Sequence, residues 1–208
     1  MEGIEIVRYN PILQEAFAHI VRNNTSNHLP YHNLNHLLTV LKFSDYIARE
    51  EGVYYDKRLP LHLAALFHDV NHSGGELPDS ENIKRAKDEW HVFCNMHAIN
   101  EEIRKEVDSI IEVTEFPYVK PDSSLSQLQV IIRDADMMQA FEYNWIHHTT
   151  LGLAKESKMS IEEFIPKQRI FLESIKLFTP SANKFKESHW RQVMDEFRIL
   201  EVCMNVNK

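Results

Sequence analysis

Residues 61–70 read LHLAALFHDV, and this stretch decides what kind of fold the rest of the chain can build. It is almost wholly apolar until it reaches His68 and Asp69. Pro60 precedes it, and proline is well tolerated in the first turn of a helix. A Ser-Gly-Gly segment at 73–75 follows and interrupts helical structure. We therefore expect a buried helix that carries polar groups at its C-terminal end.

Apolar residues at helical spacing continue on both sides of this stretch. They form stripes within residues 12–20, 37–47, 103–114, 125–141, 164–175 and 193–204. Asp79 or Ser80 is placed to cap a further helix that begins near Glu81. The 208 residues include only 5 glycines and 8 prolines, too few for a chain with many β-turns. We expect one all-α domain over residues 1–208, in which C-terminal helices at 160–205 pack on a core at about 31–141.

Composition and charge argue against several classes of protein. Hydrophobic residues make up 43% and charged residues 26% of the chain, as in an ordinary globular domain. The formal charge is 23 minus 31, or −8, without the basic stripe that is typical of a nucleic-acid-binding protein. The N-terminal residues MEGIEIVRYN lack the pattern of a signal peptide, and the apolar runs are too short to span a membrane. We expect a soluble cytoplasmic protein without a membrane or nucleic-acid partner.

Charged side chains interrupt two of the apolar helices. His68 and Asp69 follow the apolar residues 63–67, and Asp136 follows the apolar residues 130–132. An unpaired charge in such surroundings costs several kcal/mol, so each of these groups needs a partner. A cation that all of them share would be such a partner.

His36 fits the same set of groups. It lies four residues after His32, so both imidazoles share one face of a helix if that helix begins early enough. Two histidines and two aspartates suit a divalent ion such as Mn, Fe, Co, Ni, Zn or Mg. A carboxylate such as Asp69 can also bridge two metals about 3.5–4 Å apart, so we expect one or two ions. Asp134 and Asp136 point to different sides of a helix, and spacing alone leaves both open as the last ligand.

Two segments with these residues resemble a known group of enzymes. Residues 31–36, YHNLNH, are similar to the Y-H-N-x-x-H segment of the class I cyclic nucleotide phosphodiesterases, and residues 68–74, HDVNHSG, to their H-D-x-x-H-x-G segment. The order H…HD…D resembles the HD-domain superfamily of metal-dependent phosphohydrolases. Bacterial predicted HD phosphohydrolases share these motifs and a downstream pair like Glu81-Asn82. The resemblance covers roughly residues 31–141 and implies an all-α, HD-domain or phosphodiesterase-like bundle.

The resemblance also implies a role for each matched residue. The implied metal ligands are His36, His68, Asp69 and Asp136, with Asp69 bridging to a second ion and Asp136 favoured over Asp134. His72 would orient a water at the second metal, and His32 would be the general acid that protonates the leaving oxygen. Asn33 would orient the start of its helix. Asn33, Glu81 and Asn82 are further expected to contact the substrate or a water at the metal.

The function we expect is divalent-metal-dependent hydrolysis of a phosphoester, of a nucleotide or another small phosphorylated metabolite. A cyclic nucleotide or cyclic oligonucleotide phosphodiesterase is the alternative, although the nucleotide-binding glutamine of those enzymes has no counterpart in this sequence. A non-catalytic nucleotide-sensing HD module and a di-iron HD oxygenase are further alternatives. Whether the chain forms a homodimer stays open.

Overall fold

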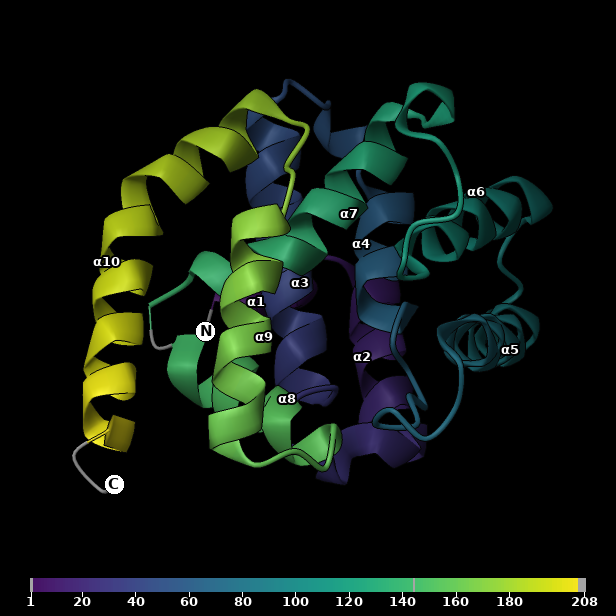
Figure 1. Ribbon diagram of the computed structural model, residues 1–208. Helices are drawn as coiled ribbons and strands as arrows, with labels where there is room; N and C mark the ends of the chain where they lie inside the picture. Colours follow the sequence, from purple (N-terminus) through teal and green to yellow (C-terminus); the bar gives the residue numbers. More distant parts are fainter. Residues whose placement is uncertain (1, 144, 206–208) are drawn as a thin grey trace.

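A computed structural model of the chain describes residues 2–143 and 145–205, and over these residues it is helical and contains no β-strand. A π-helical turn at Ile146–Thr150 and several 3-10 turns join the α-helices (Figure 1). The α-helices are α1 (Glu2–Arg8), α2 (Pro11–Asn23), α3 (Leu34–Glu50), α4 (Leu59–Phe67), α5 (Asp79–His97), α6 (Glu101–Ile111), α7 (Gln127–Met138), α8 (Leu151–Glu156), α9 (Ile161–Ser174) and α10 (Pro180–Asn205). The prediction of an all-α fold is confirmed.

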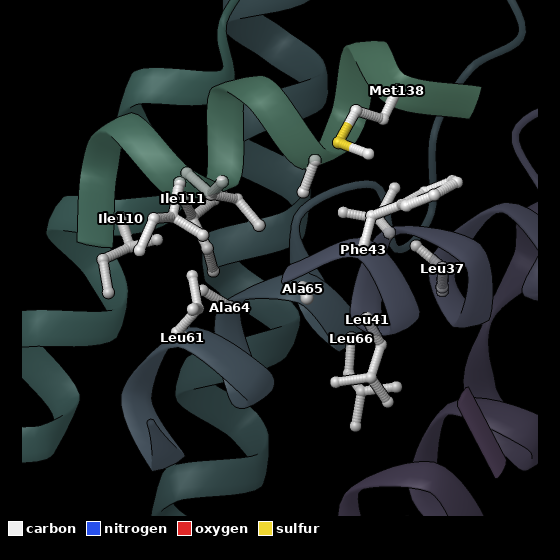
Figure 2. Packing of buried hydrophobic residues seen from close by; sticks show 14 of the residues in the cluster. Leu37, Leu41, Phe43, Leu61, Ala64, Ala65, Leu66, Ile110, Ile111 and Met138 are labelled. Carbon is white, nitrogen blue, oxygen red and sulfur yellow. The ribbon is translucent and has the colours of Figure 1, made fainter. Parts of the chain in front are cut away.

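Helix α4 lies at the centre of the bundle. All its residues from 60 to 67 are buried, as its continuous apolar sequence predicts. It packs against α3 and α6 most extensively and also contacts α2, α5 and α7. Figure 2 shows Ala65 and Leu66 of α4 among side chains from α3, α6 and α7. A helix surrounded on all sides has an apolar residue at nearly every position, rather than along one stripe.

Local signals set several of the helix ends. Ser126 begins α7 and Ser160 begins α9, each with a capping box to the residue three positions later. Helix α5 begins at Asp79, two residues before the expected start near Glu81, and Asp79 does not cap it. Its side chain instead accepts a hydrogen bond from the backbone N–H of Phe116, at 2.6 Å. Asp79 therefore ties the start of α5 to the loop that precedes α7.

The C-terminal helices pack on the rest of the bundle. Helices α8 and α9 contact each other, and α10 contacts α3, α7 and α9. Figure 1 shows α10 at one side of the bundle and α5 and α6 at the opposite side. Asp134 of α7 accepts hydrogen bonds from the backbone N–H groups of Phe178 and Thr179 and from the Thr179 hydroxyl, at 2.7–3.1 Å. Among the described residues, no helix is both long and apolar enough to cross a lipid bilayer.

The burial of α4 generates a stability prediction. Leu66 is fully buried, so Leu66→Ala should lower the free energy of unfolding by about 2–5 kcal/mol through lost apolar burial and the cavity left behind. Ile199→Ala, at a side chain that is 63% exposed, is the control and should change it by less than about 0.5 kcal/mol. Urea unfolding followed by circular dichroism measures both. Equal losses in the two variants would contradict a central α4.

Candidate active site

Three separate elements bring four of the predicted ligands together. Helix α3 carries His36, the turn after α4 carries His68 and Asp69, and α7 carries Asp136. The His36 Nε2 atom lies 3.3 Å from His68 Nε2, 3.1 Å from Asp69 Oδ2 and 3.3 Å from Asp136 Oδ1. His68 Nε2 lies 3.4 Å from Asp69 Oδ2 and 3.7 Å from Asp136 Oδ1. Two imidazole nitrogens and two carboxylate oxygens therefore face one point.

The other nitrogen of each imidazole fixes which atom carries the proton. His36 Nδ1 lies 2.7 Å from the Gln139 side-chain oxygen, and His68 Nδ1 lies 3.0 Å from the Ala65 carbonyl oxygen. Both oxygens can only accept, so both Nδ1 atoms donate their protons. The two neutral imidazoles then present bare lone pairs to each other across 3.3 Å. Such an arrangement is unfavourable without a positive charge between the rings, and it is how histidines are held in metal sites.

The electrostatics of the cluster point the same way. Burial acts to lower the pKa of His36, but its hydrogen bonds with Asp136 and Asp69 outweigh this effect and raise the pKa to about 10. Burial acts to raise the pKa of both aspartates, but the neighbouring histidines hold both pKa values below the ordinary value. Both carboxylates are therefore ionised at neutral pH, and they create a negative potential at the point that the four groups face.

The donor set fits a divalent transition metal. Bonds of about 2.0–2.2 Å place neighbouring ligand atoms roughly 3.0–3.5 Å apart in octahedral or tetrahedral coordination. The distances of 3.1–3.7 Å from the histidine nitrogens need only a small inward movement to reach that range. Both histidines are 1% exposed, whereas Asp69 and Asp136 are 13% and 18% exposed, so the carboxylates face the side that is open to solvent. His36, His68, Asp69 and Asp136 could hold one such ion.

A network of hydrogen bonds fixes the turn at 68–72, which carries two of these ligands. Asn71 sits at the centre of this turn with a positive φ of 63°, which asparagine tolerates better than most residues. Its side-chain oxygen accepts hydrogen bonds from the backbone N–H and the hydroxyl of Thr25, at 2.8 and 3.0 Å. Its amide donates to Glu89 at 3.1 Å, and Glu89 also pairs with the buried His19 at 2.7 Å. The turn is therefore anchored to α2, the loop after it and α5.

His32 lies beside this cluster and is held by a residue far away in the sequence. Its Nδ1 atom lies 2.5 Å from Glu156 Oε2, and its Nε2 atom lies 3.9 Å from Asp69 Oδ2. The other Glu156 oxygen accepts the backbone N–H groups of Tyr31 and His32, at 2.6 and 2.9 Å. Burial lowers the pKa of His32 below the ordinary value, although the hydrogen bond with Glu156 acts in the opposite direction. Glu156 thus orients the ring so that Nε2 faces the candidate metal site.

His72 stacks against His32, with ring centroids 3.7 Å apart. Its Nδ1 atom accepts the backbone N–H of Gly74 at 3.0 Å, and its Nε2 atom lies 3.0 Å from the Asn82 amide nitrogen. The Asn82 side-chain oxygen accepts the backbone N–H of Ser73, also at 3.0 Å. Asn82 therefore fixes both the loop and the ring of His72, and His72 buttresses His32.

A cavity of about 190 Å³ opens over the candidate metal site. Acidic and histidine side chains line one side of it, and apolar side chains line the other. The lining residues are Tyr31, His32, Asp69, His72, Asp79, Thr114, Phe116, Asp136, Met137, Ala140, Thr149, Leu153 and Phe171. The Thr149 hydroxyl is buried and has no hydrogen-bond partner among the described residues, so it is available to a bound molecule.

Not every residue that the sequence suggested reaches this cavity. Helix α3 begins at Leu34, later than a shared helical face for both histidines requires, and His32 lies before it. Asn33 caps α3 by accepting the Asn35 N–H at 2.8 Å, and its amide donates to the Leu29 carbonyl. Its side chain is therefore committed to the backbone and does not line the cavity.

Glu81 also lies away from the cavity. It is exposed on α5, where its carboxylate lies 3.9 Å from the Lys84 ammonium. Of the Glu81-Asn82 pair, only Asn82 approaches the site, and it does so through His72.

Sequence reasoning missed Gln139, Glu156, Asp79 and Thr149 as site residues. Gln139 had a signal, because it is a lone polar residue in the apolar run MMQAF and lies one turn after Asp136. Glu156 had no local signal, since its partner His32 is 124 residues away.

The two aspartates of α7 generate a paired prediction. Asp136→Ala should weaken the binding of Mn²⁺ by at least about 100-fold, because a carboxylate ligand is lost. Asp134→Ala should keep metal affinity but lower the free energy of unfolding by about 1–3 kcal/mol, because three donors at the start of α10 lose their acceptor. Isothermal titration calorimetry and urea unfolding measure the two effects. The opposite pattern would make Asp134 the ligand.

Comparisons with known proteins agree with this geometry. No protein-family model and no curated protein matches the chain. A predicted HD superfamily hydrolase from an uncultured Thermotogales bacterium matches with a TM-score of 0.65 at 17% identity, over 97% of this chain and 98% of that chain. A protein from Lactobacillus plantarum gives 0.66 at 15% identity over 94% and 95%, and one from Listeria innocua gives 0.60 at 22% identity over 90% and 94%. At these identities the likeness concerns the fold alone, and by that likeness the chain has the HD-domain fold that its motifs led us to expect.

Proposed function

We propose that this protein is a divalent-metal-dependent phosphohydrolase that cleaves a phosphoester of a small molecule. The observation that carries the proposal is the pair of imidazole lone pairs facing each other across 3.3 Å, with two ionised carboxylates beside them. His36, His68, Asp69 and Asp136 would hold the ion. Such an ion neutralises the charge on phosphate oxygens and lowers the pKa of water, which are the two requirements for hydrolysing a phosphoester at neutral pH.

His32 is the residue of this site that would move a proton. Its Nδ1–H is donated to Glu156, which leaves Nε2 as the atom that faces the cavity. A pKa below the ordinary value makes the protonated ring a stronger acid, so it releases its Nε2 proton readily to a departing alkoxide. The Glu156 carboxylate offsets part of the cost of the positive ring. We therefore assign general acid catalysis to His32 and a positioning role to Glu156.

The remaining polar residues of the cavity would bind and orient the substrate. The Thr149 hydroxyl is free to donate to a phosphate oxygen. His72 stacks on His32 and keeps its ring in place. Tyr31 lies over both His32 and His36, with centroids 4.7 and 4.8 Å away, and shields them from bulk water. A shielded site strengthens each electrostatic contact with the phosphate.

The proposed activity is tested by metal analysis together with hydrolysis assays. Protein purified without chelator should contain a transition metal, and added Mn²⁺, Mg²⁺, Ni²⁺ or Zn²⁺ should support hydrolysis of p-nitrophenyl phosphate or bis-p-nitrophenyl phosphate. A preference for the diester would favour a cyclic nucleotide phosphodiesterase. Bound metal without turnover would favour a nucleotide-sensing module. Neither metal nor turnover would contradict the proposal.

His32→Ala should retain the metal and lose turnover by about 10²–10⁴-fold, since the proton donor is removed while the four metal-facing residues stay intact. Steady-state kinetics and elemental analysis on the same preparation measure both properties. His28→Ala is the control, because this exposed histidine bonds only to the Thr25 carbonyl among the described contacts. Loss of metal in His32→Ala with an intact fold would show that His32 is a ligand instead.

Glu156→Gln should lower kcat more than it raises KM, because an amide can still accept the two backbone N–H groups but cannot stabilise a positive His32 ring. The acidic limb of the kcat profile against pH should shift, since the carboxylate acts to raise the pKa of His32. Glu173→Gln, at an exposed carboxylate on α9, is the matched control. A loss of stability with an unchanged pH profile would reduce Glu156 to a structural residue.

A further inference from the structure

A second cavity joins the one over the candidate metal site. It has a volume of about 410 Å³ and shares the side chains of Phe116, Met137 and Phe171 with the first. We call it the aromatic cleft, because its walls are Phe116, Tyr118, Phe171 and Phe178 together with Met137 and Ile175. A molecule held by its phosphate at the metal site therefore has direct access to the aromatic cleft.

The rings of the aromatic cleft are arranged at right angles. The Phe116 ring lies 5.4 Å from Tyr118 and 5.9 Å from Phe171, with interplanar angles of 82° and 88°. Phe116 is 44% exposed and Phe178 is 36% exposed, so apolar surface is left open beside the catalytic cavity. Neighbouring exposed apolar side chains of this kind mark a binding site more often than isolated ones do.

The polar groups of the aromatic cleft restrict what it can hold. The Tyr118 hydroxyl is buried and has no hydrogen-bond partner among the described residues, and burial raises the pKa of this group, so it stays an uncharged donor. The charged side chains nearby are paired: Lys120 lies 3.2 Å from Glu112, and Asp122 lies 3.1 Å from Arg133. The aromatic cleft therefore suits an uncharged planar ring that carries at least one hydrogen-bonding atom.

We propose that the aromatic cleft binds the heteroaromatic ring of the substrate, and that the substrate is a phosphoester of an alcohol bearing such a ring, as a nucleoside phosphate is. The inference rests on the proposed phosphohydrolase activity and adds the class of its substrate. Phe171 and Phe116 contribute ring faces, and Tyr118 contributes a hydrogen bond. Phe171 lies in α9, outside the part of the chain that carries the motifs.

The kinetic test compares two substrates that differ only in the ring. With Mn²⁺ present, the protein should hydrolyse adenosine 5′-monophosphate with a KM at least about tenfold lower than that for ribose 5-phosphate. Phe171→Leu keeps the apolar bulk but removes the ring, and it should abolish this difference while leaving ribose 5-phosphate turnover unchanged. Phe116→Leu is the second variant in case the first fails to fold. Ile170→Ala, at a residue that is 69% exposed on the same helix, is the control and should keep the difference.

A binding test separates this inference from the proposed activity. Calorimetric titration of the metal-free protein with adenosine should give binding at least about tenfold tighter than with ribose, and Phe171→Leu should remove that preference. If adenosine binds in this way but no phosphoester is hydrolysed, the aromatic cleft stands and the proposed activity fails. If phosphoesters are hydrolysed but adenosine binds no better than ribose, or Phe171→Leu has no effect, the ring-binding assignment is overturned.

Discussion

The molecule is organised around two imidazole nitrogens that face each other across 3.3 Å. Each ring is held in this orientation by an acceptor behind it, Gln139 for His36 and the Ala65 carbonyl for His68. Two carboxylates from different elements complete the cluster. Such a group of polar atoms is costly in an apolar interior unless a cation binds there, so the surrounding helices have to stabilise an arrangement that is unfavourable by itself.

The apolar burial of α4 supplies that stability. Because α4 is surrounded by five other helices, its C-terminal end is fixed in position, and the turn at 68–72 begins directly from it. Asn71 and Glu89 then fix the path of this turn with hydrogen bonds to α2, its following loop and α5. The positions of the metal-facing atoms thus depend on packing several residues away, and rigid support of this kind is what a metal site requires.

The sequence predicted the parts of this structure that have a local signature. The continuous apolar run at 61–70 predicted a buried helix with polar groups at its end, and the polar interruptions at His68, Asp69 and Asp136 predicted which side chains would meet. Long-range pairings had no such signature. Glu156 lies in an ordinary polar stretch, and only the tertiary fold brings it to His32. Helix starts were also misjudged, since the cap at Asn33 and the early start of α5 depend on side chains that several alternatives could have matched.

The contact between Glu156 and the segment at Tyr31 and His32 has a consequence for how the protein matures. The two halves of this contact are separated by 124 residues, so the entropy of closing a long loop must be offset before it can form. A ribosome-bound chain that has exposed only the motif-bearing region already contains every metal-facing residue, but it lacks the carboxylate that orients His32. During synthesis, the capacity to retain an ion therefore precedes the capacity to turn over a substrate.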